Sequence, residues 1–222
     1  GAALDAFRRA ETQMVIRTYL GLALALALLA GGVAGRRKRL AETISSHADM
    51  GKAFNLLKRA RFAFGAACIC LYVGAEVSMG SIIVNYLMQT NTLGLPAGAA
   101  GKHVPFYWGG ALVGRFIGAY VLKSVSPGKI LAFNAGMVVL LLLVSANTIG
   151  AVSGWSLLAV GLFNSIMFPT IFALASEGLG PRTADGSGVI CMAIVGGAIV
   201  PIVTGAAADA MGLKGALIVP AI

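Results

Sequence analysis

A single acidic residue lies deep inside a long apolar segment of this chain. Glu76 is surrounded by small and apolar residues, whereas Glu177, Asp185 and Asp209 lie near the ends of such segments. A carboxylate in a membrane interior is energetically costly, so it is expected to face a cavity or a partner. The sequence leaves three roles open for Glu76: to bind a sugar hydroxyl, to carry a proton, or to pair with Arg115.

Two stripes of residues run along the helix expected around Glu76. Tyr72, Glu76 and Gly80 share one face at i, i+4 spacing. Small and polar residues form a second stripe on nearly the opposite side: Gly74, Ser78, Ser81 and Asn85. Both stripes line one substrate pathway if the helix bends near Gly80; otherwise the second is a packing face, with Asn85 bonding a neighbouring helix. Tyr72, Glu76 and Asn85 are our candidate substrate-binding residues, and Gly80 a candidate flexible point.

A later apolar segment contains an asparagine one turn before a proline. Pro169 lacks an amide hydrogen and should kink the helix, which frees the carbonyl of Ser165. Asn164 offers both a donor and an acceptor to a polyol, or serves as a hydrogen bond between helices. We predict Asn164 as a substrate contact, and Phe168, Pro169 and Pro201 as gating positions, because interrupted helices around a midplane site are typical of transporters.

Glycines recur at every fourth position in another segment: Gly110, Gly114 and Gly118. This pattern predicts close packing against a neighbouring helix. Arg115 lies beside the stripe, within reach of the cytoplasmic membrane surface. It could bind loops there, or form an ion pair with Glu76.

The cysteines and histidines are not spaced as a metal or redox site. Cys68 and Cys70 lack the CxxC spacing, and Cys191 lies in a different apolar segment. His47 and His103 fall in polar linkers. An intramembrane enzyme would need a nucleophile and base or a metal set, so we expect no enzyme activity, no catalytic residue, no metal and no cofactor.

The composition is that of a membrane protein. Of the 222 residues, 58% are hydrophobic and 11% are charged, whereas a soluble domain carries about 25% charged residues. The net charge of +9 could indicate a nucleic-acid partner, but the basic residues lie mainly beside apolar segments, as in cytoplasmic loops. We therefore expect a lipid bilayer, and no nucleic acid, as a partner.

A membrane span needs about 20 apolar residues, and on this basis we predict an all-α bundle. The expected spans are 14–35, 62–88, 105–123, 130–148, 155–176 and 186–208. A seventh begins near Leu213 and is cut off at Ile222. Because the chain opens with Gly1 rather than Met, we expect an internal piece of a longer protein.

Basic residues predict the orientation and the division of the chain. The stretch 36–61 carries a dense cluster of Lys and Arg, which the positive-inside rule places in the cytoplasm. We expect residues 1–35 to be the last helix of an N-terminal half. Residues 36–61 would then be a linker between the halves, and residues 62–222 a C-terminal transmembrane half with a truncated final helix.

Four stretches of the chain resemble one transporter family. They are residues 72–86 (YVGAEVSMGSIIVNY), 107–118 (YWGGALVGRFIG), 163–170 (FNSIMFPT) and 191–201 (CMAIVGGAIVP). Together, and in this order, they resemble the fucose:proton symporter family of the major facilitator superfamily, which includes fucose and glucose/galactose permeases. The resemblance covers nearly the whole chain.

This resemblance implies twelve helices in two pseudo-symmetric halves, with the substrate between them and access alternating across the membrane. It implies symport of a hexose or deoxyhexose with a proton across the bacterial cytoplasmic (inner) membrane. The chain would begin with helix six and would need the missing N-terminal half, where the family's coupling acids mainly lie. A part in sugar binding is carried over for Glu76 alone.

A channel or a structural membrane subunit without coupled transport is the alternative. Channels tend to carry rings of charge or filters of backbone carbonyls, and neither is evident in the sequence. Saturable, pH-dependent uptake would favour a transporter over both.

Overall fold

A computed structural model describes residues 2–36 and 50–222 of the chain. It forms two compact units, Gly1–His47 and Ala48–Ile222. The first unit contains one long helix, α1 (Ala2–Arg36), in which Thr12–Gly35 is long and apolar enough to cross a membrane. Half of the predicted basic linker 36–61, residues 37–49, lies outside the described residues.

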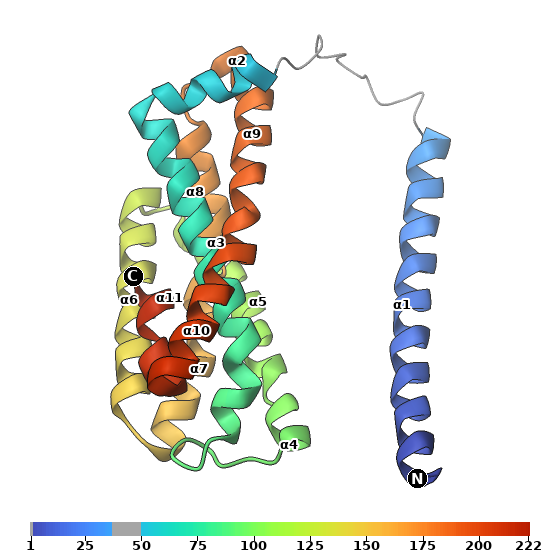
Figure 1. Cartoon of the computed structure of the whole chain (residues 1–222). Helices are drawn as coiled ribbons and strands as arrows, with labels where there is room; N and C mark the ends of the chain where they lie inside the picture. The colour runs from blue at the N-terminus through green and yellow to red at the C-terminus, as the bar shows by residue number, and fades with distance from the viewer. Residues whose placement is uncertain (1, 37–49) are drawn as a thin grey trace. The chain divides into compact units, whose positions relative to one another are not determined.

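The second unit is a bundle of helices (Figure 1). Its longer helices are α3 (Ala60–Met88), α5 (Val104–Val121), α6 (Pro127–Asn147), α7 (Gly150–Asn164), α8 (Met167–Ser176), α9 (Thr183–Met192) and α10 (Gly196–Ala216). Shorter ones are α2 (Met50–Phe54), η2 (Asn55–Lys58), α4 (Ala97–Gly101), η3 (Gly180–Arg182), η4 (Ala193–Val195) and α11 (Ile218–Ala221). The described ranges contain no β-strand, and the predicted all-α fold is confirmed.

Most of the predicted spans are present. Besides Thr12–Gly35, the helices long and apolar enough to cross a membrane are Ala60–Met88, Pro127–Asn147, Gly150–Ser176 and Gly180–Ala216. The span predicted at 105–123 is the helix α5, but it is not among them, because Arg115 and its glycines lower its hydropathy. The boundary predicted at 208 was wrong, since α10 continues to Ala216.

The chain turns back on the bundle after α10. Gly212 has a φ of 80° inside that helix, a backbone conformation that glycine adopts without a steric penalty. Beyond it, α11 packs against α3 and α6, and Leu217 is fully buried. A new segment thus begins close to Leu213, where the seventh span was predicted to begin, and its described part packs onto the bundle.

Glycines bring pairs of helix backbones into direct contact. A Cβ atom on Gly114 would lie 2.0 Å from the Leu162 carbonyl oxygen, which fixes α5 along α7. A Cβ on Gly196 would lie 1.9 Å from the Cys70 carbonyl oxygen, which fixes α10 along α3. Small residues allow such close approach between membrane helices, and the packing role predicted for the Gly110–Gly118 stripe is confirmed.

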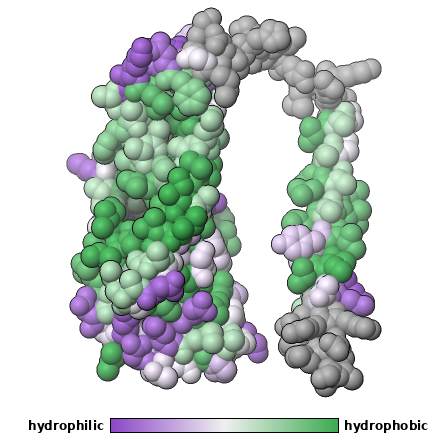
Figure 2. All heavy atoms as spheres, in the orientation of Figure 1, coloured by the Kyte–Doolittle hydropathy of each residue, from purple (hydrophilic) through white to green (hydrophobic). Residues whose placement is uncertain are grey.

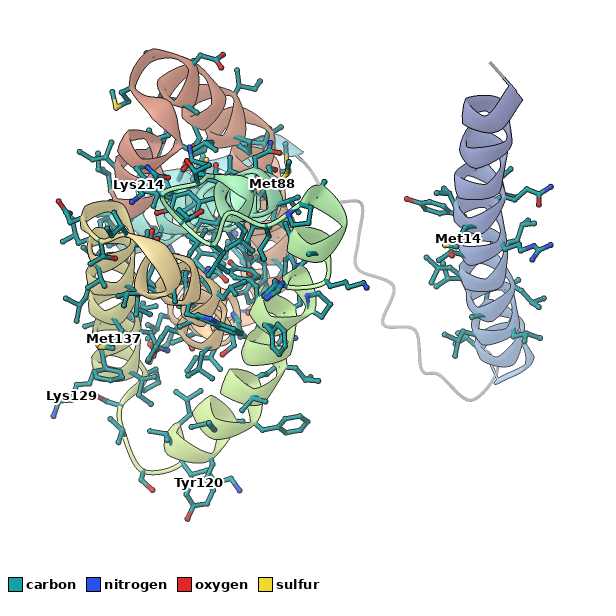
Figure 3. All side chains as sticks on the ribbon, turned by 90° about the horizontal axis from the view of Figure 1, so that it is seen from below. Met14, Met88, Tyr120, Lys129, Met137 and Lys214 are labelled. Carbon is teal, nitrogen blue, oxygen red and sulfur yellow. The ribbon has the colours of Figure 1, made fainter. Side chains whose placement is uncertain are left out.

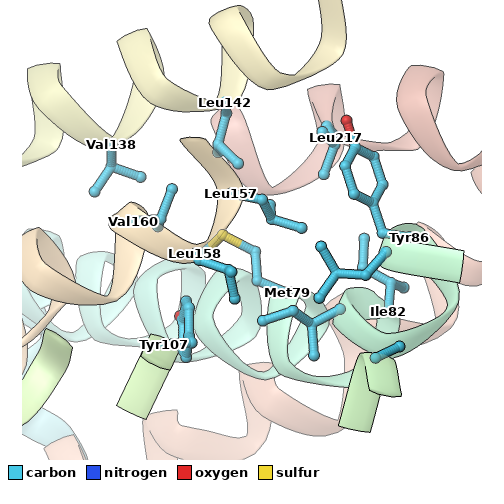
Figure 4. Close-up of a cluster of buried hydrophobic side chains, with 13 residues drawn as sticks. Met79, Ile82, Tyr86, Tyr107, Val138, Leu142, Leu157, Leu158, Val160 and Leu217 are labelled. Atoms are coloured by element: carbon cyan, nitrogen blue, oxygen red, sulfur yellow. The ribbon is translucent and has the colours of Figure 1, made fainter. Parts of the chain in front are cut away.

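Apolar side chains from α3, α5, α6 and α7 meet in a buried cluster that includes Met79, Tyr107, Leu142 and Leu157 (Figure 4). On the face of the second unit seen in Figure 2, hydrophilic residues gather toward the two ends and apolar residues cover most of the part between them. Tyr120 and Lys129 project away from the bundle (Figure 3). This distribution of polar and apolar surface is that of a bundle that crosses a membrane.

The contact at Gly114 predicts a graded loss of stability. Gly114→Ala in the complete protein should lower the free energy of unfolding by about 1–3 kcal/mol, the usual cost of overpacking, because backbone atoms cannot yield as a flexible side chain does. The matched control on the same helix is Gly109→Ala, since a Cβ there would meet nothing within 4 Å. Thermal unfolding in detergent measures both; equal midpoints for the two variants would contradict the packing assignment.

Candidate functional site

The polar centre of the second unit is built around a break between two helices. The helix α7 ends at Asn164 and α8 begins at Met167, so the interruption comes a few residues before Pro169. Pro169 has no amide hydrogen, so the carbonyl of Ser165 has no helical donor. This accounts for the position of the interruption. The predicted interruption is confirmed, whereas a gating role for Phe168 and Pro169 stays a prediction.

Three helices are tied together by hydrogen bonds at this break. The Tyr72 hydroxyl of α3 donates to the Asn164 carbonyl oxygen over 2.8 Å. The Asn164 side-chain amide donates to the Tyr107 hydroxyl of α5 over 3.0 Å. All three residues are buried. Tyr72 thus satisfies a carbonyl at the end of α7, where helical partners are lacking, and the structure brings two predicted site residues into direct contact.

Tyr107 is a site residue that the sequence did not reveal. Its hydroxyl is buried and accepts the Asn164 amide. It stands next to glycines and aromatic residues in α5, and no periodicity in that segment distinguishes it. Only the crossing of α5 over α7 brings it to Asn164, so the sequence held no signal that could have found it.

Glu76 lies one turn beyond Tyr72 on α3 and is partly exposed. No ion pair joins Glu76 to Arg115 within 4.0 Å in the described part of the chain, and the Arg115 side chain is exposed. The Glu76 carboxylate therefore has no cationic partner within the described residues, and its role in binding a sugar or a proton stays a prediction.

The second stripe of α3 divides into a packed part and an exposed part. Gly74 lies against Val200 of α10, and Ser78 accepts a hydrogen bond from Thr204 over 3.1 Å. Asn85 is exposed, and in the described residues it makes no hydrogen bond to a neighbouring helix. The helix is continuous through Gly80, so the packing interpretation holds for Gly74 and Ser78, while substrate binding by Asn85 stays a prediction.

The other predicted positions lie on either side of the bundle. Pro201 is inside α10, one and a half turns after the short 3₁₀ segment Ala193–Val195. Phe168 is partly buried and stacks on Phe172, with ring centroids 6.2 Å apart. Within the described residues, neither forms a hydrogen bond or a ring contact with Tyr72, Asn164 or Tyr107, and their roles in gating stay predictions.

Two cavities adjoin the helix break. One, of about 290 Å³, lies between α3, α6, α8 and α11, with Tyr72 and Asn164 in its wall. The other, of about 430 Å³, lies between α5, α6 and α7 and is lined by Gly114, Asn134 and Ser165 among others. Glu76 and Asn85 line neither of these two cavities, so the predicted substrate-binding residues do not share one enclosed pocket within this chain.

Comparisons with known proteins identify the class of molecule. No protein-family model matches the chain. It is 46% identical over 221 residues to the glucose/galactose transporter of Brucella abortus, covering 100% of the chain and 54% of that relative. It is 36% identical over 152 residues to the L-fucose-proton symporter of Escherichia coli, covering 68% of the chain and 34% of the symporter.

A putative glucose/galactose transporter of Helicobacter pylori is 40% identical over 200 residues, covering 90% of the chain and 48% of that relative. In space, the chain matches the crystal structure of the major facilitator transporter FucP in its outward conformation, with a TM-score of 0.74 and 31% identity. That match covers 81% of the chain and 44% of FucP. The chain has the fold of one half of a major facilitator transporter, and its sequence resembles those of sugar transporters of that superfamily.

Within this superfamily the resemblance to the fucose:proton symporter family is confirmed. The named relatives are transporters rather than enzymes, and a major facilitator chain with several spanning helices is a multi-pass membrane protein. The chain spans about half the length of the curated relatives it matches. This agrees with the prediction that it corresponds to one half of a major facilitator fold.

The Tyr72 contact predicts a loss of stability without a change of shape. Tyr72→Phe removes only the hydroxyl and leaves the Asn164 carbonyl without its donor, which typically costs about 1–3 kcal/mol. The matched control is Tyr120→Phe, since Tyr120 is 74% exposed. The measurement is the unfolding midpoint of the complete protein in detergent, and a Tyr72→Phe midpoint equal to that of the control would show that the bond contributes nothing.

Proposed function

We propose that this chain is part of a secondary active transporter that moves a hexose or deoxyhexose together with a proton across the bacterial inner membrane. The observation that carries the proposal is the partly exposed Glu76 carboxylate, which lies inside a membrane span without an ion-pair partner. A carboxylate removed from water is costly unless its charge is compensated, so it readily binds a proton or accepts hydrogen bonds from several hydroxyl groups. The names of the relatives support a sugar as the substrate.

The proposed mechanism is alternating access, in which two halves move about a shared midplane site. In this proposal the helix α1 closes the first half, residues 36–61 link the halves in the cytoplasm, and residues 62–222 form the second half. The Arg61–Glu177 ion pair joins the first turn of α3 to the residue after α8, which fits a rigid cytoplasmic end. The N-terminal half would complete the site.

The first test replaces the carboxylate. Glu76→Gln in the complete transporter should abolish accumulation of sugar against a gradient while leaving the amount of protein in the membrane unchanged, because the amide neither binds a proton nor carries charge. Asp209→Asn is the control, since this acid is exposed near the end of α10. Uptake of radiolabelled glucose, galactose and fucose into vesicles with an imposed proton gradient measures both. Accumulation at the wild-type level in the Glu76 variant would refute the proposal.

The second test asks whether this chain transports on its own. Residues 1–222 reconstituted alone in proteoliposomes should show no sugar uptake, because one half supplies only one wall of the pathway. Co-reconstitution with the upstream half should restore saturable uptake. Sugar-specific, saturable uptake by the 222-residue chain alone would indicate a self-assembling half-transporter instead.

A further inference from the structure

A tryptophan inside α5 lies over a bare position on α3. Trp108 is 51% exposed. At Gly80 of α3, the one atom within 4 Å of an added Cβ is Cζ2 of the Trp108 indole, at 3.7 Å. Gly80 precedes the end of α3 by eight residues, or about 12 Å of helix. The indole therefore covers a part of α3 that has no side chain of its own.

The orientation of this indole is set by the hydrogen-bonded network at the helix break. The Trp108 ring meets the Tyr107 ring edge-on, with centroids 5.1 Å apart and planes at 88°. Tyr107 is 1% exposed and its hydroxyl accepts the Asn164 amide. A buried, hydrogen-bonded neighbour thus positions the Trp108 ring while about half of that side chain stays accessible.

Charged groups lie next to the indole on the same two helices. Glu76 is one turn from Gly80 on α3, about 6 Å along the helix axis. Arg115 follows Trp108 by two turns on α5, so both project from the same face of that helix. An exposed indole and an exposed guanidinium thus lie on one face of α5, and a partly exposed carboxylate lies one turn from the glycine that the indole covers.

This combination matches the chemistry of a pyranose. A hexose ring carries hydroxyl groups around its edge, and its C–H bonds give one face apolar character. The face of an aromatic ring is electron-rich and attracts such hydrogens, whereas a carboxylate accepts hydrogen bonds from neighbouring hydroxyls. We propose that Trp108 is the platform on which the sugar ring stacks, with Glu76 accepting hydrogen bonds from its hydroxyls; this inference rests on the proposed function.

A role as an interfacial anchor is the competing explanation, and Trp155 shows what such a residue looks like here. Its ring packs edge-on against Phe106 at 5.4 Å and against His103 at 5.9 Å, in an aromatic group near the start of α5 and α7. Amphipathic rings of this kind concentrate where a membrane meets water. Trp108 instead adjoins a glycine in the helix that bears the lone carboxylate, and Trp155 supplies the matched control.

The experiment compares Trp108→Leu, Trp108→Phe and Trp155→Leu in the complete transporter. Removal of the ring at 108 should raise KM for glucose and galactose roughly two- to tenfold, because this is the change in affinity expected when one aromatic stacking contact is lost. Trp108→Phe, which keeps a smaller ring, should lie between wild type and Trp108→Leu, and Trp155→Leu should leave KM unchanged. Equilibrium binding of radiolabelled sugar to purified folded protein separates affinity from yield.

A second readout addresses the stacking itself. An acyclic hexitol offers the same kind of hydroxyls without a ring face, so wild type should prefer the hexose over the hexitol as a competitor. Trp108→Leu should lose most of that preference. An unchanged KM, an unchanged preference, or a loss confined to Vmax and folded protein would overturn the platform. Absence of hexose uptake in wild type would instead overturn the proposed function, and the platform with it.

Discussion

Direct contact between helix backbones at glycines determines where the functional side chains of the second unit lie. A Cβ on Gly161 would lie 2.1 Å from the Tyr107 carbonyl oxygen, so α5 and α7 touch at that point. Because lipid tails are as apolar as the helices, the hydrophobic effect does not drive helices together in a membrane. Close packing at glycines stabilises their association instead. Gly161 precedes Asn164 by one turn, so the contact that fixes α5 also brings the Tyr107 hydroxyl to the Asn164 amide.

Hydrogen bonds close several sets of buried polar groups in this unit, although Gln89 Oε1 and Ser176 Oγ have no partner within the described residues. Near the outer ends of α3, α6 and α7, the Tyr86 hydroxyl and the Ser145 and Ser153 hydroxyls bond one another and the Ser145 carbonyl at 2.7–2.9 Å. Every donor in this set is used, as a low-dielectric interior requires. Glu76 differs because it is an acidic side chain that stays partly exposed and has no ion-pair partner in the described part of the chain. That contrast, rather than burial alone, makes it our first candidate for a functional group.

Sequence patterns predicted those features of the fold that depend on a single helix. The apolar lengths gave the spans, the Gly110–Gly118 spacing gave a packing face, and Pro169 gave the helix break. Patterns could not say which helix lies opposite which, since that depends on crossing angles and on atoms from distant segments. The partner of Tyr72 and the role of Tyr107 are of this kind. The helix α5 has a lower mean hydropathy than the other spans because Arg115 and the glycines that pack it against α7 offset its apolar side chains.

The buried hydrogen-bonded network and the exposed side chains of the candidate site lie on the same helices but differ in what they do. Tyr72, Asn164 and Tyr107 are enclosed by the bundle and fix α3, α7 and α5 relative to one another. Trp108, Glu76 and Arg115 lie on the accessible side of the same helices. Because the network is centred on the break after Asn164, a change of angle between α7 and α8 would displace Tyr107 and the Trp108 ring packed on it. The break between α7 and α8 thus lies where a movement would reach these accessible residues through a single buried network.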